Sequence, residues 1–406
     1  MSMPEYDVII AGAGPAGSAT ALHCARAGLS VLLLDASRFP RDKPCSDALS
    51  AAAIAAIRAL GLEDRLLALP HARTREIAFH APDGASVTVP IPVIDKHAQA
   101  AAVICRRVLF DAMLFDAASQ ECKAVDWCRV TGLLRDGDRV VGVTADRGGG
   151  RMARFTARAV VGADGANSLV ARQLGLPRLP EYRAQAAQTY YRQVTGLQGN
   201  LEIHFLEETL PGYLWIYPSE TSQTNVGLTI PLAVSREKNI NPAKVFDAAL
   251  ASSALRERFQ YAERMDRIHI RVLPVGNPMR EIHGNGALLV GDAAGLVSPC
   301  SSEGVANALV SARVAAEILV EAVRKGDCSE TGLRGYPYRL WRLLAPQLEM
   351  AGRLAALRTP RAIGSLIRSA ARRPHNAAWL SGVLIGSALP SEELEDLLAY
   401  LRFFSR

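Results

Sequence analysis

The residues of this chain that could support chemistry begin with three glycines near its start. Gly12, Gly14 and Gly17 have the spacing G-x-G-x-x-G and follow directly on a short apolar run, and a second apolar run ends on Asp35. Glycines at this spacing permit a tight turn and the close approach of a pyrophosphate, and a carboxylate at the position of Asp35 can accept hydrogen bonds from ribose hydroxyls. The pattern predicts a dinucleotide-binding site, with an ordinary strand–helix turn as the alternative.

Two more glycine–aspartate turns follow apolar runs far along the chain. Asp164 and Gly165 come after the run at 157–161, and Gly291 and Asp292 come after the run at 286–290. No second G-x-G-x-x-G follows a strand-like run. The sequence therefore predicts one dinucleotide site, on which segments remote in sequence converge.

Four side chains are candidates for the reaction itself. Cys45 lies in a charged, proline-containing loop, and Tyr213, Trp215 and Tyr217 alternate along a strand-like run. Alternate residues of a strand share a face, so the three aromatic side chains can line a substrate chamber together. A small buried cysteine and an ordinary aromatic core are the alternatives.

The elements that must position these residues follow from the periodicity of the sequence. Helices are expected at 48–60, 107–119, 242–254 and 303–324, and β-rich structure from about 182 to 230. From residue 332 onward the chain is expected to be helical, with breaks at Pro346, Pro360, Pro374 and Pro390. The fold class is α/β: a parallel Rossmann-type sheet, an interleaved β-rich substrate domain and a helical C-terminal part. The dinucleotide-binding domain is assigned to 1–75, 101–180 and 275–330, the β-rich domain to 76–100 and 181–274, and the helical region to 331–406.

Composition places the chain among globular proteins. It has 406 residues, 49% of them hydrophobic and 21% charged, and no apolar run reaches the ~18 residues of a spanning helix. Seven scattered cysteines, without a C-x-x-C pair, favour a reducing cytoplasm. The eight histidines show no ligand spacing, so no metal site is predicted. His204 and His269 are expected to be structural.

Arginines are concentrated near the C-terminus. Nine arginines and one acid, Glu349, lie between Arg334 and Arg373, for a local charge of nine minus one, or +8. Such helices can contact a membrane surface peripherally or bind a phosphorylated group, and a solvated helix face is the alternative. No nucleic-acid partner is predicted.

The three turns together resemble those of FAD-dependent oxidoreductases of the p-hydroxybenzoate hydroxylase type, and most closely those of the geranylgeranyl reductase family. The Lys-Pro-Cys45 loop, the helix start at Arg107 and the aromatic strand before Pro218 are similar as well. The resemblance implies that FAD is held in part by Arg107, Asp164, Gly165 and Asp292, with the turn from Pro299 to Gly304 and the helix start at Val305 facing the flavin. It also implies that Gly12, Gly14, Gly17 and Asp35 hold the ADP half. Pro15, Ala16 and Gly291 are further residues expected to bind the cofactor.

Three departures from the family pattern bear on the substrate and the reaction. Ser46-Asp47-Ala48 replaces a glycine-rich run, Ser302-Glu303-Gly304 replaces Gly-Glu-Gly, and Gly295 stands where hydroxylases often carry histidine. The last departure favours a reductase over a hydroxylase.

The resemblance implies hydride transfer from reduced FAD to a carbon–carbon double bond of a hydrophobic, prenyl-like or polyketide-like substrate. The expected electron donor is NAD(P)H, bound transiently, or a ferredoxin-like protein. The alternative is an FAD-dependent monooxygenase acting on an aromatic or polyketide-like molecule. A halogenase and a flavin-binding protein without turnover rank below these. Nothing in the sequence specifies the oligomeric state.

Overall fold

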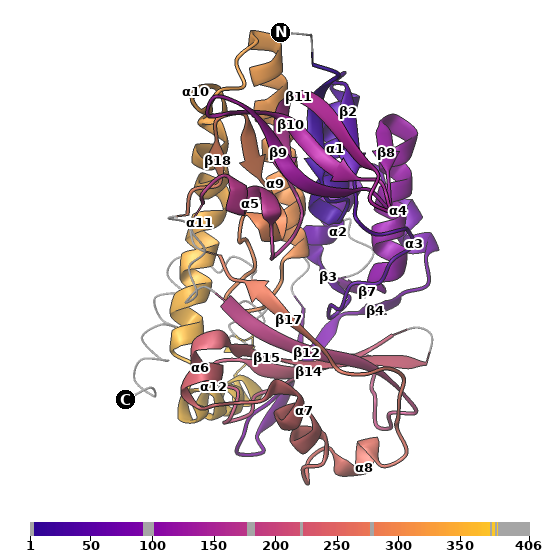
Figure 1. Cartoon of the computed structure of the whole chain (residues 1–406). Helices are drawn as coiled ribbons and strands as arrows, with labels where there is room; N and C mark the ends of the chain where they lie inside the picture. The colour runs from indigo at the N-terminus through magenta and orange to yellow at the C-terminus, as the bar shows by residue number, and fades with distance from the viewer. Residues whose placement is uncertain are drawn as a thin grey trace.

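The computed structural model describes residues 4–91, 101–176, 183–219, 222–276, 280–373, 376–377 and 380. Its strands form two large sheets and one small sheet (Figure 1). The first large sheet has the order β18-β19-β11-β1-β2-β8, and β10 and β9 extend from β11. Its strands are β1 (Tyr6–Ala11), β2 (Val31–Leu34), β8 (Lys123–Val125), β9 (Arg129–Asp136), β10 (Arg139–Asp146), β11 (Met152–Gly162), β18 (His283–Gly284) and β19 (Ala287–Leu289).

The centre of the first sheet is parallel and covered on both faces. β1 pairs in parallel with β2 and β11, and β11 pairs in parallel with β19. Val8 and Ile10 pack into one hydrophobic core and Ile9 into another, as expected when neighbouring side chains of a strand point to opposite faces. Helix α1 (Pro15–Arg26) packs between α4 (Arg107–Glu121) and α9 (Val305–Lys325). The predicted Rossmann-type arrangement is confirmed.

The second large sheet lies beside the first and supplies the β-rich part of the molecule (Figure 1). Its order is β16-β12-β15-β14-β13-β5-β6, with β17 paired to β12. Along β14, Leu214 and Ile216 pack on the face with α7, whereas Tyr213, Trp215 and Tyr217 share the opposite face, as predicted. The strands are β5 (Glu76–His80), β6 (Ser86–Pro90), β12 (Arg183–Arg192), β13 (Leu201–His204), β14 (Tyr213–Pro218), β15 (Gln223–Pro231), β16 (Glu263–Arg264) and β17 (His269–Pro274).

The third sheet is small and shows that one predicted helix boundary is wrong. It has the order β3-β7-β4, with β3 (Ala48–Ser50), β4 (Ala72–Thr74) and β7 (Ala102–Ile104). The sequence predicted a helix from residue 48 to residue 60, but residues 48–50 are a strand and α2 spans Ala51–Ala59. The alanine-rich run favours a helix, while pairing of β3 with β7 and the cap that Ser50 gives to Ala53 N–H fix the boundary.

The C-terminal part is helical. Helix α11 (Gly335–Ala356) runs alongside both large sheets and leads to α12 (Pro360–Arg372) (Figure 1). The break predicted at Pro360 is confirmed, because Pro360 is the first residue of α12 after its cap, Thr359. The break predicted at Pro346 is wrong, since this proline lies inside α11. Leu340, Leu344 and Leu348 bury one side of α11, which offsets the roughly 3 kcal/mol cost of an interior proline.

The breaks expected at Pro374 and Pro390 lie outside the described residues. No helix in the described part of the chain is both long and apolar enough to cross a membrane. The domain boundaries proposed above stay a prediction. The remaining helices are α3 (Glu63–Ala68), α5 (Leu169–Gln173), α6 (Leu232–Glu237), α7 (Pro242–Leu250), α8 (Arg256–Phe259), α10 (Glu330–Leu333) and the short 3₁₀ turn Gly291–Ala293.

Candidate active site

A cavity of about 370 Å³ lies where the three glycine-containing turns meet. Segments remote in sequence do converge there, as the sequence predicted. The predicted site residues lining it are Gly14, Pro15, Ala16, Cys45, Arg107, Asp164, Gly165, Tyr213, Trp215, Asp292, Gly304 and Val305. The other predicted site residues do not line this cavity: Gly12, Gly17, Asp35, Tyr217, Gly291 and Pro299.

Gly12 and Gly17 do not line the cavity, but they allow close contacts between backbone segments that form it. Gly12 has φ +102°, and a Cβ built there would lie 2.3 Å from the carbonyl oxygen of Ala163, in the second turn. A Cβ on Gly17 would lie 1.8 Å from the carbonyl oxygen of Gly12. Both distances are far below van der Waals contact, so only glycine fits. These two residues hold the first turn against α1 and against the second turn.

Two helix N-termini, each preceded by a glycine, border the cavity. Gly14 precedes α1 and Gly304 precedes α9, and neither glycine can supply a side-chain cap, although the Glu303 carboxyl group accepts a hydrogen bond from the Ala306 N–H of α9. Free N–H groups and the helix dipole favour negative charge at such positions. Asp164 Oδ1 is buried beside the same cavity with no hydrogen-bond partner among the described atoms. Phosphate acceptors in a ligand fit the helix starts, and a ligand hydroxyl fits the free oxygen of Asp164, so these residues fit FAD.

Asp35 is buried at the end of β2 and is already engaged by the backbone. Its carboxylate accepts hydrogen bonds from the N–H of Ala13 at 2.7 Å and from the N–H of Ser37 at 2.8 Å. Arg41 Nε lies 3.8 Å from it. In this structure Asp35 therefore stabilises the glycine turn through the Ala13 N–H. Its contact with a ribose stays a prediction.

Arg107 is the most deeply buried charged group of the cavity wall. It donates to Asp111 through two hydrogen bonds of 2.6 and 2.7 Å, and Arg41 contacts the same carboxylate at 2.9 Å. Burial alone would raise the pKa of Asp111, but the two guanidinium groups outweigh it and lower that pKa below its usual range. The Cys45 side chain lies near the Arg107 guanidinium and contributes to raising the pKa of Arg107. The ion cluster thus fixes both the start of α4 and the Cys45 loop.

Asp292, in the third turn, lines the cavity. Lys43, from the Cys45 loop, lies 3.0 Å from its carboxylate. Burial would raise the pKa of Asp292, but the ion pair with Lys43 outweighs burial and lowers it. A carboxylate is therefore kept at the place where the family resemblance puts the flavin side chain.

Asp47 is a site residue that the sequence reasoning did not select. It is buried, has φ +64°, and accepts from Tyr190 Oη at 2.6 Å and from Asn225 Nδ2 at 2.8 Å. Asn225 also donates to the carbonyl of Cys45 at 2.6 Å and accepts from Trp215 Nε1 at 2.9 Å. Burial raises the pKa of Asp47 to about 6. This network ties the Cys45 loop to the aromatic strand β14.

The departure from the family pattern at Ser46-Asp47-Ala48 could have pointed to Asp47 as a site residue. The related family has glycines in this stretch, and the left-handed φ of Asp47 is a conformation that glycine, asparagine and aspartate tolerate best. Asp47 therefore has a backbone conformation that is typical of glycine, and it adds a carboxylate to the site.

A second, smaller cavity of about 90 Å³ shares part of its lining with the first one. We call it the inner cavity. Cys45 lines both cavities, which confirms its pocket position, and Tyr217 lines the inner one. Glu303, at the start of α9, also lines the inner cavity and hydrogen-bonds to Ser50 Oγ. The rest of the lining is mainly apolar, with Leu49, Ile77, Ile91, Ala102, Leu201, Ile203 and Val305 among its members.

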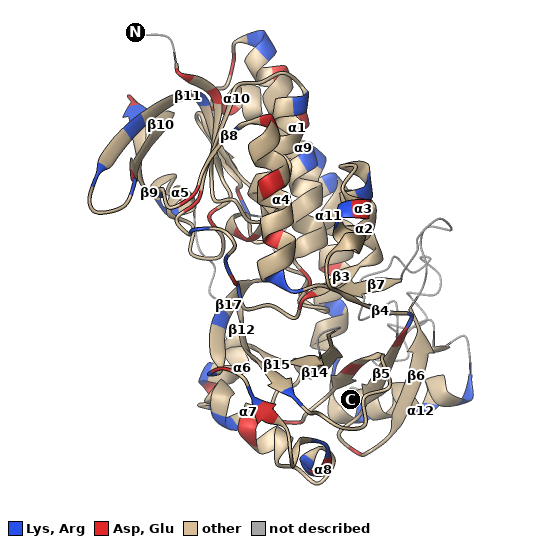
Figure 2. Cartoon of the chain, turned by 90° about the vertical axis from the view of Figure 1, so that its right-hand side faces the viewer, with Lys and Arg blue, Asp and Glu red and all other residues tan. Residues whose placement is uncertain are grey.

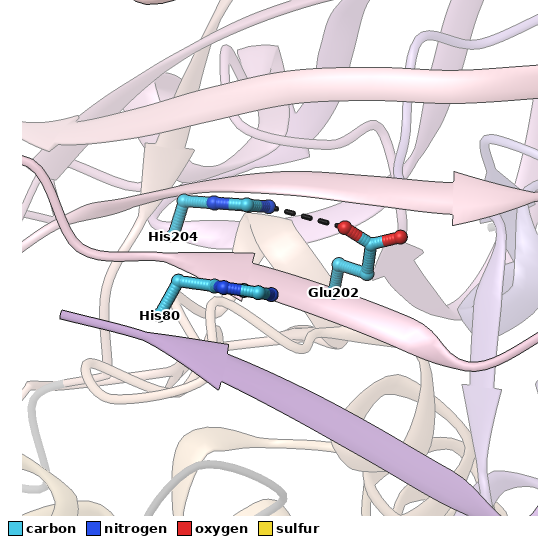
Figure 3. Close-up of side chains that lie close together, drawn as sticks. All are labelled: His80, Glu202 and His204. Atoms are coloured by element: carbon cyan, nitrogen blue, oxygen red, sulfur yellow. Dashed lines mark hydrogen bonds and ion pairs between the residues drawn. The ribbon is translucent and has the colours of Figure 1, made fainter. Parts of the chain in front are cut away.

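A second cluster of titratable groups lies on the β-rich sheet, where β5 pairs with β13 (Figure 3). The rings of His80 and His204 stack with their centroids 4.1 Å apart, and His204 Nε2 lies 3.2 Å from Glu202. Arg258 donates to both carboxylate oxygens of Glu202, at 2.6 and 2.8 Å. Burial lowers the pKa of His80 to about 4. Because Arg258 already neutralises Glu202, this cluster is explained as a buried ion pair with its histidine neighbours.

Not all arginines of the arginine-rich C-terminal region face solvent. Figure 2 marks the described lysines and arginines along the ribbon. Arg358 is buried, Arg339 pairs with Glu321 across to α9, and Arg368 pairs with Asp83. The local excess of positive charge is therefore partly used inside the fold. His269, expected to be structural, contacts Asp266 and also borders the large cavity.

Comparison with known proteins supports FAD as the cofactor. Residues 5–340 match the family described as "FAD binding domain". The chain is 32% identical over 324 residues to a menaquinone reductase of Mycobacterium tuberculosis, covering 77% of this chain and 76% of the relative. It is 31% identical over 346 residues to digeranylgeranylglycerophospholipid reductase 1 of Methanopyrus kandleri, covering 82% and 86%.

Solved structures show the same fold. A geranylgeranyl bacteriochlorophyll reductase-like protein from Thermoplasma acidophilum superposes with a TM-score of 0.82 at 20% identity, covering 97% of this chain and 96% of the other. A flavin-dependent brominase superposes with a TM-score of 0.75 at 23% identity, covering 98% and 97%.

Fold, cavity and sequence matches together define an FAD-dependent oxidoreductase. The chain belongs to the geranylgeranyl reductase family of these enzymes.

Proposed function

We propose that this enzyme reduces a carbon–carbon double bond in the prenyl chain of a hydrophobic substrate. The carrying observation is the apolar inner cavity, which adjoins the FAD-fitting cavity and shares Cys45, Tyr213 and Gly304 with it. Its aliphatic residues, which include Leu49, Ile77 and Leu201, suit contact with an isoprenoid chain. The relatives are named for reduction of geranylgeranyl lipids and of menaquinone, which are compounds of this kind.

The residues of the chain have distinct tasks in this reaction. Bound FAD supplies the hydride and its electron pair. The N–H groups that begin α9 favour negative charge at the cavity, by roughly 0.3–1 kcal/mol for an exposed helix start. The apolar wall of the inner cavity excludes water from the double bond. The ion pair of Lys43 and Asp292 joins the Cys45 loop to the third turn in the wall of the FAD-fitting cavity.

An anaerobic single turnover tests the proposal. The FAD-loaded enzyme is reduced with dithionite, freed of excess reductant and mixed with geranylgeraniol without oxygen. We expect flavin reoxidation and a product heavier by two hydrogen atoms. A strict need for oxygen, with a product heavier by one oxygen atom, would contradict the proposal and support the monooxygenase.

For the electron donor we propose NAD(P)H, bound transiently. The sequence has one G-x-G-x-x-G turn, and His269 and Arg271 border the large cavity, where a cation can attract an anionic cofactor. NADPH and NADH should bleach the flavin absorption in stopped-flow mixing. If neither does and a reduced ferredoxin does, the donor is a protein.

For the location of the substrate we propose a peripheral membrane contact through the basic C-terminal helices, because a prenyl lipid resides in a bilayer. The unpaired part of the positive charge would then contact anionic lipid. Sedimentation with vesicles of anionic and of neutral phospholipid tests this. Equal recovery in the supernatant with both vesicle types would contradict it.

Gly227 sets the position of an aromatic residue in the cavity wall. A Cβ on Gly227 would lie 2.2 Å from Trp215 Cζ2, so Gly227→Ala must displace the indole. We expect a loss of about 1–3 kcal/mol of stability from this overpacking and a higher KM for the prenyl substrate. Denaturant unfolding and steady-state kinetics measure the two effects.

Gly284→Ala is the matched control for that variant, because its Cβ would meet only Leu174 at 3.5 Å. An unchanged KM in Gly227→Ala would show that Trp215 does not shape the substrate chamber.

A further inference from the structure

Reduction of a double bond needs a proton as well as a hydride. The hydride forms a C–H bond at one carbon with its own electron pair. The π bond breaks, and its two electrons form the second C–H bond with a proton at the neighbouring carbon. An acidic group beside the double bond must therefore supply that proton, and solvent must then restore it. This requirement rests on the proposed function.

We infer that Glu303 is the catalytic acid of this enzyme: its carboxyl O–H bond breaks and the proton passes to the substrate carbon next to the one that takes the hydride. Glu303 is the only carboxylic acid among the described residues lining the inner cavity. It lies just before α9, one residue from Gly304, which borders both cavities. Glu303 therefore lies in the inner cavity, which shares Gly304 with the cavity that fits FAD.

The surroundings of Glu303 come from three other segments of the chain. Ser50 of β3 hydrogen-bonds its carboxyl group, Tyr213 and Tyr217 approach from β14, and Cys45 borders the same cavity. No lysine or arginine is among the described residues that line this cavity. The Ala306 N–H at the start of α9 favours the ionised carboxylate, but burial outweighs it, so the carboxyl group can keep a proton near neutral pH.

Titration properties support this choice over the two tyrosines. Burial raises the pKa of Glu303 to about 7, although the hydrogen bonds from Ser50 and the Ala306 N–H act in the opposite direction. Burial also raises the pKa of Tyr213 to about 12, and that of Tyr217 well above its usual value. General acids work best when their pKa is near the working pH, so Glu303 is the better donor. The rate should fall as pH rises through about 7.

Glu303→Gln tests the inference with little change of shape. We expect the rate of geranylgeraniol reduction to fall about 10²–10⁴-fold, the usual contribution of a general acid, while FAD binding and dithionite reduction of the flavin stay normal. A Glu303→Gln variant that reduces the substrate at the normal rate would overturn the inference.

A second measurement does not depend on turnover. Infrared spectroscopy of the FAD-loaded enzyme should show a protonated carboxyl band that disappears as pH rises through about 7 and is absent from Glu303→Gln. A carboxylate already ionised at pH about 5, close to the ordinary glutamate pKa, would overturn the inference even if no substrate had been found. Absence of reduction by the unaltered enzyme, with that band present, would instead contradict the proposed function.

Ser50→Ala should raise the pKa of Glu303 further. Loss of the Ser50 hydrogen bond removes an interaction that lowers the Glu303 pKa, so the alkaline limb of the rate should move to higher pH. Ser50 also caps α2, and Ser329→Ala, which removes a comparable cap from α10, controls for that loss. An unchanged limb in Ser50→Ala would show that another group titrates.

Discussion

Replacing Gly17 by alanine should abolish FAD binding and lower stability severely. The new Cβ would lie 1.8 Å from the carbonyl oxygen of Gly12 and 3.1 Å from Ala163 Cβ. Backbone cannot yield as a flexible side chain can, so α1 must move away from β1 and the second turn. We expect a loss in the upper range for single substitutions, about 3 kcal/mol or more, and colourless protein. Denaturant unfolding and flavin absorption measure both effects.

Gly14→Ala separates the ligand from the fold in the same turn. Its φ is −70°, and its Cβ would meet only Arg41 Nη2, at 3.5 Å. This variant should fold with normal stability yet bind FAD less tightly, because Gly14 borders the cavity where the pyrophosphate is expected. If Gly17→Ala were as stable as Gly14→Ala, the close contact between the turn and α1 would not be needed.

Replacing Arg107 by methionine should have the second large effect. Asp111 is fully buried and would keep only Arg41 as a partner. Removing one member of a buried ion pair typically costs about 3–5 kcal/mol, because the remaining charge is left without compensation. The Cys45 side chain would also lose its guanidinium neighbour. We expect reduced stability in denaturant unfolding together with weaker FAD binding.

The double variant Arg107→Met, Asp111→Leu is the control for the ion pair. It removes both buried charges and should recover part of the lost stability, since apolar replacements of a buried pair are often tolerated. Strictly additive losses in the two single variants and the double variant would contradict coupling between these side chains.

The positions of the cofactor-binding turns were predictable, whereas the chemistry around the substrate was only partly so. In a parallel sheet, the carboxyl ends of the strands lie at one edge, and the apolar runs before Gly12, Asp164 and Asp292 therefore predicted their convergence. The shared face of the aromatic residues in β14 followed from the period of two in a strand.

Other features depend on contacts between remote segments. Asp47 is 143 residues from Tyr190 and 178 from Asn225, and Glu303 is 253 from Ser50. Local patterns do not encode such pairs, so neither acid was selected. The helix through Pro346 likewise depends on packing of α11 against the first core, which outweighs a local helix breaker.

Titration of the protein with FAD tests the central claim most directly, namely that three remote turns form one FAD site beside an apolar chamber. Flavin fluorescence should saturate at one FAD per chain, and Gly14→Ala should weaken binding without unfolding the protein. Protein that takes up no FAD, or that binds it equally well in the Gly14→Ala and Gly17→Ala variants, would contradict the account.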